Sequence, residues 1–311
     1  MKILQSPADA AEGLRGYPAE RSWVEIPSGE GQIIRINVID AGLPFAPPVV
    51  LLHGNPSWSY LWRHQIGPLV EAGHRVIVPD LVGMGMSDKP SELDDYSVER
   101  HVEWMRCLLV DELALSGCAF VLHDWGGIIG MRLAAEQPGL VDRMVISNTG
   151  LPWRDITEPL PDDLDASGPY ADFQEMVRTV PLWEPWTLLT LVLHKDPTEE
   201  QVAGYHAPYP DPALTIGSRA FTQLLPTRPD NPMYPANYEA WKTLDDWHRP
   251  VLTIFSDHDT VAPNGWEMIV DRVPGAAGQP HVILEGGGHF LQEDIPDAYN
   301  EALLSWLEVT S

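Results

Sequence analysis

Cysteine is scarce in this chain, which has only two among its 311 residues. Cys107 falls within an expected helix, and Cys118 opens an expected core strand. Small secreted domains that depend on disulfides use a much higher share of cysteine, so a disulfide scaffold is excluded. We expect two buried free thiols instead, which suits the reducing cytoplasm.

Basic residues are also few, since 19 Lys and Arg stand against 45 Asp and Glu, and the formal net charge is −26. A field of this sign repels phosphate backbones and anionic lipid surfaces. We therefore expect no nucleic-acid partner and no attachment to an anionic membrane.

Long apolar runs are missing as well. The longest apolar segments, 47–52 and 186–193, are far shorter than the about 20 residues that a membrane-spanning helix needs. The first seven residues lack the apolar core of a signal peptide, and Asp9 and Glu12 follow soon after. We expect a soluble, cytoplasmic protein.

The chain does have enough apolar material for a large core, because 44% of its residues are hydrophobic. Short β-rich apolar runs alternate with helical patterns, which is typical of a mostly parallel sheet. Strands are expected at 22–26, 33–40, 48–52, 75–79, 119–122, 143–147, 251–255 and 281–284, and helices at 58–72, 97–113, 127–137, 265–272 and 296–307. We predict an eight-stranded α/β fold with helices on both faces of the sheet.

One region interrupts the alternation. Residues 150–250 hold 15 of the 30 prolines and show short helical pieces in place of strand–helix pairs. Because structureless loops of this length are rare in compact domains, we predict a helical cap over 151–249, inserted after the sixth strand. The α/β core then comprises 1–150 and 250–311. A long surface excursion is the alternative.

Asp124 stands where the strand at 119–122 turns sharply into a helix. In that strand–turn–helix context a nucleophile elbow exposes its reactive side chain. A serine that displaced a leaving group from a saturated carbon would form an ether that water does not cleave, whereas an aspartate forms an ester that water can hydrolyse. The elbow therefore predicts hydrolysis at an sp³ carbon. On its own, Asp124 fits equally well as a turn residue or helix N-cap.

Further polar residues follow other strands of the expected sheet. Asn55 follows the third strand, Asp257 and Asp259 follow the seventh, and His289 follows the eighth after three glycines. In a doubly wound sheet the carboxyl ends of the strands share one crevice, so these residues can meet Asp124 there. The chain order nucleophile, acid, histidine is that of the α/β-hydrolase triad. Taken singly, each residue fits an ordinary loop or turn.

The chain resembles the haloalkane dehalogenases of the α/β-hydrolase superfamily. The resemblance rests on the segments at 53–56 (HGNP), 59–63 (SYLWR), 79–90 (PDLVGMGMSDKP), 123–127 (HDWGG) and 288–293 (GHFLQE). It implies the α/β-hydrolase fold, with a small halogenated alkane and water as substrates and a halide ion as product. It further implies no cofactor and no metal, and a monomer or small homo-oligomer.

The resemblance also implies residue roles. Asp124 is expected to be the nucleophile, and Trp125 and Asn55 the halide donors. His289 is expected to activate the hydrolytic water, and Asp259 to orient His289.

The triad acid has alternatives. Asp259 is preferred over Asp257 because it precedes Thr260-Val261-Ala262-Pro263, the stretch that usually follows the acid in hydrolases. Some relatives place the acid after the sixth strand, but the matching residue here is Asn148, which cannot serve.

The second halide donor is open too. One branch of the family uses a cap tryptophan, and this chain has Met176 at about that position. Trp153, Trp183 and Trp186 are therefore kept as candidates to assist or replace Asn55.

Epoxide hydrolases share the Asp-Trp-Gly elbow and form the alternative function. They typically place a glycine where this chain has Leu122, and an aromatic residue where it has Asn55. They also use cap tyrosines to protonate the epoxide oxygen, and Tyr205 and Tyr209 remain possible donors. A non-catalytic ligand-binding member of the fold and a luciferase-like oxygenase are the more remote alternatives.

Overall fold

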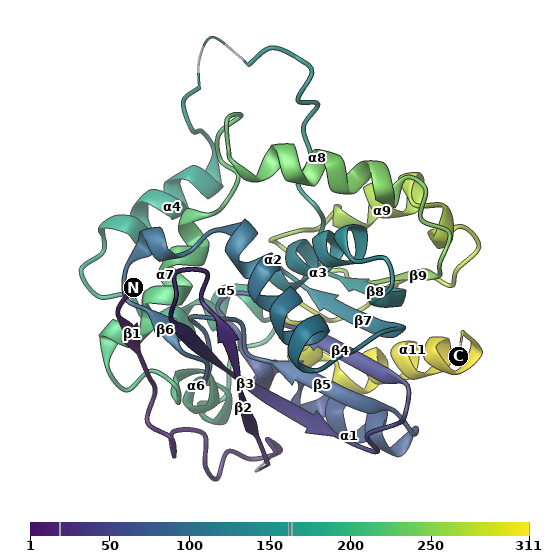
Figure 1. Cartoon of the computed structure of the whole chain (residues 1–311), viewed down its shortest axis with the longest axis horizontal. Helices are drawn as coiled ribbons and strands as arrows, with labels where there is room; N and C mark the ends of the chain where they lie inside the picture. Colours follow the sequence, from purple (N-terminus) through teal and green to yellow (C-terminus); the bar gives the residue numbers. More distant parts are fainter. Residues whose placement is uncertain (19, 161, 163, 311) are drawn as a thin grey trace.

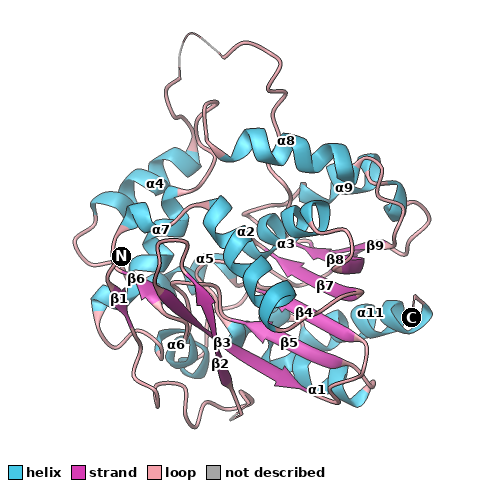
Figure 2. Cartoon of the chain, in the orientation of Figure 1, coloured by secondary structure: helices cyan, strands magenta, loops and turns pink. Residues whose placement is uncertain are grey.

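The computed structural model describes residues 1–18, 20–160, 162 and 164–310. Within them, eight strands form one sheet in the order β10-β9-β8-β7-β4-β5-β3-β2. Figures 1 and 2 label its strands from β2 to β9. The bounds are Ser22–Pro27 for β2, Ile33–Ala41 for β3, Pro48–Leu52 for β4, Arg75–Pro79 for β5, Cys118–His123 for β7, Val141–Ser147 for β8, Val251–Ser256 for β9 and Val282–Leu284 for β10. The pairs β2–β3 and β3–β5 are antiparallel and the remaining pairs parallel, which confirms the mostly parallel sheet.

A smaller, two-stranded antiparallel sheet joins β1 (Ile3–Leu4) to β6 (Lys89–Pro90). It ties the beginning of the chain to the loop that follows β5. Inside this loop Lys89 is fully buried, and its Nζ donates to the carbonyl oxygens of Gly85 and Ser87 at 2.7 and 2.8 Å.

Alternate residues of the central strands pack into two separate hydrophobic clusters, one on each face of the sheet. In β4, Val50 and Leu52 join one cluster, while Val49 and Leu51 join the other, as the two-residue period of a strand dictates. Helices α2 (Val98–Arg106), α3 (Trp125–Glu136) and α9 (Gly265–Arg272) contribute to the first cluster, and α1 (Arg63–Glu71) and α11 (Pro296–Val309) to the second. The predicted cover of helices on both faces is confirmed.

Two predicted helices are less regular than the sequence pattern suggested. The helix expected at 58–72 begins with a 3₁₀ turn at Ser59–Trp62 before α1. The helix expected at 97–113 starts at Ser97, whose Oγ accepts the Arg100 amide at 3.2 Å, but it changes to π-helical geometry over Cys107–Glu112. Both cysteines are free and buried, as predicted.

Between β8 and β9 the chain forms a series of short helices, and we use the name cap for residues 151–249. The helices are α4 (Pro169–Thr179), α5 (Leu189–Val192), α6 (Glu199–His206), α7 (Ile216–Gln223) and α8 (Met233–Leu244). Prolines open α4 and the 3₁₀ turns at Pro185–Leu188 and Pro212–Thr215, where a missing amide proton costs nothing. Helices α4 to α7 lie at the end of the sheet toward which the parallel strands point, and α8 packs against α3 (Figure 1).

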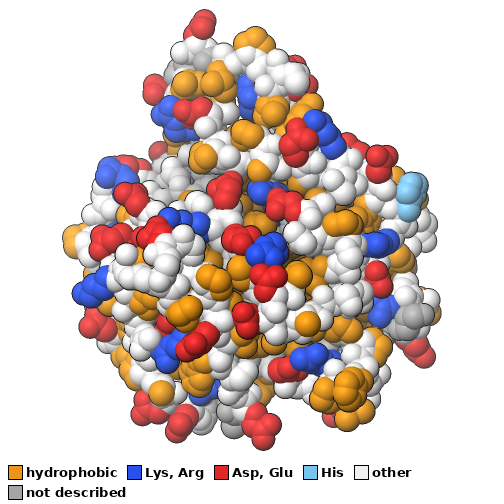
Figure 3. All heavy atoms as spheres, viewed as in Figure 1, with side chains coloured by type: hydrophobic (Ala, Val, Ile, Leu, Met, Phe, Trp, Pro, Cys, Tyr) orange, Lys and Arg blue, Asp and Glu red, His pale blue; other side chains and the backbone are white. Residues whose placement is uncertain are grey.

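The surface carries many charges of both signs. On the face shown in Figure 3, acidic and basic side chains are interspersed, and the basic side chains of the described residues gather into no continuous patch there. Across the described ranges, no helix combines the length and the apolar composition needed to cross a membrane.

Candidate active site

Asp124 sits on a sharp turn between β7 and α3. Its backbone has φ 50° and ψ −125°, a conformation that costs an L-residue about 1–3 kcal/mol and persists only where its surroundings enforce it. The Thr149 hydroxyl donates to the Asp124 carbonyl oxygen at 2.6 Å. A Cβ added to Gly126 would lie 2.2 Å from the Leu52 carbonyl oxygen, and one added to Gly54 would lie 2.0 Å from Asp124 Oδ1. These two glycines let the elbow pack close to the end of β4.

The structure brings Asp124, Asp259 and His289 together from three strand ends. His289 Nε2 lies 3.5 Å from Asp124 Oδ2, and His289 Nδ1 lies 2.9 Å from Asp259 Oδ1. His289 and Asp259 are buried. Among the described residues, His289 Nε2 has no hydrogen-bond partner, so this nitrogen is available to a water or substrate atom.

Asp257 and Asn148 occupy other places. Asp257 accepts a hydrogen bond from the Gly286 amide at 2.8 Å and lies 3.5 Å from His258 Nε2, so it supports the glycine turn. Asn148 Nδ2 donates to the carbonyl oxygens of Gly288 and His289 at 3.1 and 2.9 Å. Asn148, at the position where some relatives place the acid, therefore holds the loop that carries His289 by hydrogen bonds.

Electrostatics favour an ionised Asp124. Burial opposes the charge on Asp124 and Asp259, but the neighbouring His289 outweighs burial and lowers the pKa of both carboxyls. Burial likewise opposes the charged form of His289, yet the two carboxylates raise its pKa to about 9. The adjacent His123 stays neutral because burial lowers its pKa to about 4. The lowered pKa keeps Asp124 ionised at neutral pH, the form in which a carboxyl group is nucleophilic.

Two backbone amides converge on the Asp124 carboxylate. The Asn55 amide donates to Asp124 Oδ1 at 2.7 Å, and the Trp125 amide also hydrogen-bonds the carboxyl group. Such a pair of amides is the arrangement that stabilises an oxyanion. The Asn55 side chain, unlike its backbone amide, has no observed hydrogen bond to the site within the described residues. Its Oδ1 is buried without a partner among these residues, and Asn55 does not line the cavity described next.

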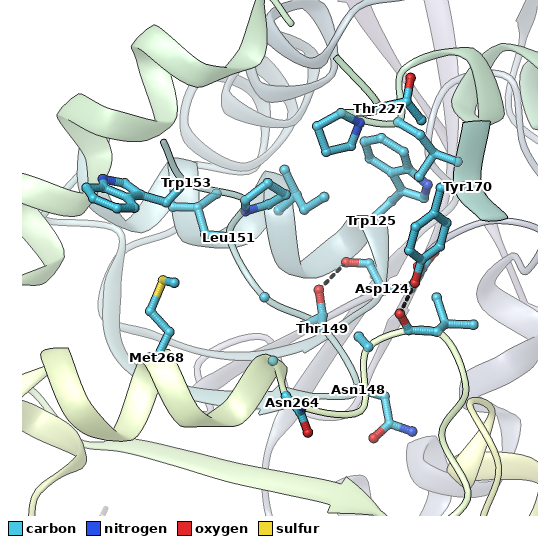
Figure 4. Close-up of a pocket in the computed structure, with 18 of the residues that line it drawn as sticks. Asp124, Trp125, Asn148, Thr149, Leu151, Trp153, Tyr170, Thr227, Asn264 and Met268 are labelled. Carbon is cyan, nitrogen blue, oxygen red and sulfur yellow. Dashed lines mark hydrogen bonds between the residues drawn. The ribbon is translucent and has the colours of Figure 1, made fainter. Parts of the chain in front are cut away.

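A cavity of about 440 Å³ opens above Asp124, between the strand ends and the cap (Figure 4). Its walls are mostly apolar. Trp125 and Ile128 line it from α3, Leu151, Trp153, Tyr170, Leu225 and Pro226 from the cap, and Val261, Ala262 and Met268 from the segment after β9. This volume and lining suit a small apolar ligand. Among the described residues, no group of three or more His, Cys, Asp or Glu side chains is placed to hold a metal ion.

Of the three cap tryptophans that were candidates for the second halide donor, only Trp153 lines this cavity. It is half exposed and stacked on Tyr238. Trp183 donates its indole N–H to Ser218 Oγ at 3.1 Å, and Trp186 packs on His206 with ring centroids 4.2 Å apart. The Met176 side chain is 46% exposed and does not line the cavity.

Neither predicted cap tyrosine reaches the cavity. Tyr205 is buried and donates to Glu293 Oε1 at 2.7 Å, in a cluster where Glu293 also pairs with Arg63. The buried Tyr209 hydroxyl accepts the Gly85 amide at 2.9 Å. Tyr170, which sequence reasoning missed, does line the cavity, and its hydroxyl donates to the Val261 carbonyl oxygen.

The strand order, the elbow and the convergent triad residues define a class of protein, and comparison with known proteins agrees. A family model described as "alpha/beta hydrolase fold" matches residues 47–296. A haloalkane dehalogenase of Mycobacterium tuberculosis is 39% identical over 100% of both chains, and one of Psychrobacter cryohalolentis is 36% identical over 99% of this chain and 98% of its own. The chain therefore belongs to the haloalkane dehalogenase family within the α/β-hydrolase fold.

A solved structure supports the same grouping. The tetrameric haloalkane dehalogenase of Paraglaciecola agarilytica superposes with a TM-score of 0.85 at 26% identity, over 98% of this chain and 99% of that one. The agreement extends over the cap as well as the sheet, because nearly the whole of each chain is matched.

Proposed function

We propose that this protein hydrolyses small haloalkanes to an alcohol, a halide ion and a proton, through a covalent ester on Asp124. The observation that carries the proposal is an ionised carboxylate at an elbow, facing a mostly apolar cavity of about 440 Å³, with a buried imidazole 3.5 Å away. A carboxylate in that position can attack a bound alkyl halide in line.

In the first step Asp124 attacks the carbon that carries the halogen. A carbon–oxygen bond forms, and the carbon–halogen bond breaks with its electron pair leaving on the halide. The proposed halide donors are the indole N–H of Trp125, which lines the cavity, and the side-chain amide of Asn55. Asn55 lies outside the cavity lining, so its amide must turn toward the halide to serve as the second donor. Neutral donors suit an anion that must leave again, since a buried cation would hold it more tightly.

In the second step water attacks the carbonyl carbon of the ester. His289 Nε2 takes the proton of this water, and Asp259, 2.9 Å from Nδ1, stabilises the imidazolium. The amides of Asn55 and Trp125 hold the negative oxygen of the tetrahedral intermediate. On collapse the bond between the acyl carbon and the alkoxy oxygen breaks, and the remaining hydroxyl proton of the intermediate passes to that oxygen to give the alcohol. The Asp124 carboxylate is restored, and the imidazolium of His289 releases its proton to solvent. Because the ester no longer carries the Asp124 charge, the pKa of His289 falls from about 9 during this step, which makes the neutral base available.

Epoxide hydrolysis is the second candidate, and one observation speaks for it: a phenol, Tyr170, lines the cavity. Epoxide opening needs a proton donor, and Tyr205 and Tyr209 are engaged elsewhere. Burial and the charges of Asp259 and Asp124 raise the pKa of Tyr170, which makes it a weaker acid. Haloalkane hydrolysis needs no such donor, so it remains the preferred function.

One panel separates the two functions. Wild type is assayed for bromide release from alkyl bromides of several lengths and for diol formation from epoxides, beside the variant His289→Phe. We expect multiple turnovers of bromide release by wild type. The variant should release up to one equivalent of bromide and then stall as a covalent ester, seen as added intact mass. Steady turnover by His289→Phe, or diols without bromide from wild type, would overturn the proposal.

The quaternary state belongs to the proposal too. Because the Paraglaciecola agarilytica relative is tetrameric, we propose that this chain also forms a small homo-oligomer. Sedimentation equilibrium at several concentrations measures the assembled mass directly, and a monomer at every concentration would contradict it.

A further inference from the structure

Tyr170 links the cap to the loop that carries Asp259. It is the second residue of α4, and its ring lines the cavity beside Trp125 (Figure 4). Its hydroxyl donates to the carbonyl oxygen of Val261, two residues after Asp259. A cap side chain is thus bonded to the segment that follows β9.

A single peptide group connects this hydrogen bond to a second one, which reaches the Asp259 carboxylate. The Val261 carbonyl and the Ala262 amide belong to the same peptide group, and the Ala262 amide donates to Asp259 Oδ2 at 3.2 Å. The other oxygen, Oδ1, accepts the Val261 amide at 2.8 Å and His289 Nδ1 at 2.9 Å. A donor on a peptide carbonyl polarises the group and strengthens donation by its N–H. The hydroxyl of Tyr170 therefore supports the carboxylate that orients His289.

Because its hydroxyl donates to a backbone carbonyl, Tyr170 does not serve as a hydrogen-bond donor to the leaving group of the substrate. Its single phenolic hydrogen is committed to Val261, on the segment that carries Asp259. Asp259 in turn is buried, so its orientation depends on the few donors that reach it.

We propose that Tyr170 is a positioning residue through which the docked cap holds Asp259 in the orientation that His289 needs to hydrolyse the ester on Asp124. This inference rests on the proposed function. It makes ester hydrolysis, and not the alkylation of Asp124, the step that depends on the Tyr170 hydroxyl.

The test uses Tyr170→Phe, which keeps the ring and removes the hydroxyl. The matched control is Tyr234→Phe. Tyr234 is also a cap tyrosine, and its hydroxyl donates to the Pro226 carbonyl oxygen at 3.4 Å. No chain of hydrogen bonds among the described residues connects that carbonyl to Asp259. Rapid-mixing measurements with an alkyl bromide give the bromide burst, which reports alkylation, and the subsequent steady rate. Intact mass gives the fraction of covalent ester.

In Tyr170→Phe the burst rate should stay within about twofold of wild type, whereas ester hydrolysis slows about five- to tenfold, the effect of losing one supporting hydrogen bond. The ester should accumulate accordingly. With a weaker amide donor on Oδ2, Asp259 holds the His289 proton more strongly, so the rising limb of the pH–rate profile of hydrolysis should move to higher pH. Within the part of the chain that the structure describes, the other titratable groups facing His289 are Asp124, esterified at this stage, and His123, which stays neutral. Tyr234→Phe should match wild type in the burst rate, the hydrolysis rate, the fraction of ester and the pH profile.

A slower burst with unchanged hydrolysis would make Tyr170 a leaving-group contact and overturn the inference, and so would a pH profile identical to that of wild type. A substrate-free measurement keeps the two proposals distinguishable. The titration of the His289 imidazole, followed by ¹⁵N NMR, should give a higher pKa in Tyr170→Phe than in wild type or Tyr234→Phe. If wild type released no bromide the proposed function would fail, while equal His289 titrations in all three proteins would refute the link itself.

Discussion

Replacing Asp259 by asparagine should separate the two chemical steps. Asp259 Oδ1 accepts hydrogen bonds from His289 Nδ1 and the Val261 amide, and Oδ2 accepts one from the Ala262 amide. An asparagine must turn its NH₂ group toward one of these oxygen positions, where it meets an N–H donor. The variant therefore loses the negative charge beside His289 together with at least one hydrogen bond.

The size of the effect follows from the geometry. A hydrogen bond to a charged group contributes about 1.5–3 kcal/mol, which corresponds to about 10- to 160-fold in rate. Misplacement of the imidazole tautomer adds to this, and the corresponding change in a serine protease triad costs about 10⁴-fold in kcat. We expect ester hydrolysis in Asp259→Asn to fall by at least about 100-fold, while the bromide burst persists. The pKa of His289 should also drop, because Asp259 is one of the two carboxylates that raise it.

The assay is pre-steady-state bromide release with intact-mass detection of the ester. Asp257→Asn is the control, since this neighbouring carboxylate bonds the Gly286 amide and does not contact His289. It should keep wild-type kinetics within about twofold, because its contacts are partly exposed. Wild-type hydrolysis in Asp259→Asn, or a selective loss of hydrolysis in Asp257→Asn, would refute the assignment of the acid.

Two further predictions concern Trp125 and His289. Trp125→Phe keeps an aromatic wall in the cavity but removes the indole N–H, so the bromide burst should slow about tenfold with little change in ester hydrolysis, and an unchanged burst rate would argue against halide contact. Because the folded-state pKa of His289 is about 9 against an ordinary value of 6.5, its contribution to stability is fully present below pH 6.5 and is lost as pH rises through about 9. The melting temperature of wild type should therefore fall more between pH 7 and 10 than that of His289→Phe, and parallel curves would contradict the raised pKa.

The sheet could be predicted closely because each strand is a short, bounded apolar run. All eight strands occur, with ends shifted by at most two residues, as at Val141–Ser147, predicted from residue 143. Helix interiors were predicted less well, since the change to π-helical hydrogen bonding at Cys107–Glu112 leaves the apolar pattern intact. Within the cap, prolines mark several helix starts, but the way these helices dock depends on contacts with other elements, which no local pattern records.

The site likewise contains residues that could be predicted from the sequence and one that could not. Asp124, Asp259 and His289 follow strands whose carboxyl ends must converge in a parallel sheet, so the sequence was enough to bring them together. Tyr170 was missed because its place above Asp124 depends on how α4 docks. Its position at the start of a proline-opened helix is the only local signal it gives, and many surface tyrosines share it.

The central claim, a covalent ester on Asp124, is tested most directly by the origin of the oxygen in the product alcohol. In a single turnover with enzyme in excess over an alkyl bromide in H₂¹⁸O, water attacks the carbonyl carbon of the ester, so the carboxylate oxygen that attacked the substrate leaves with the alkyl group. A covalent ester on Asp124 therefore gives unlabelled alcohol, with ¹⁸O in the peptide that contains Asp124. Alcohol labelled with ¹⁸O in that first turnover would show that water attacks the substrate directly and would contradict the covalent ester.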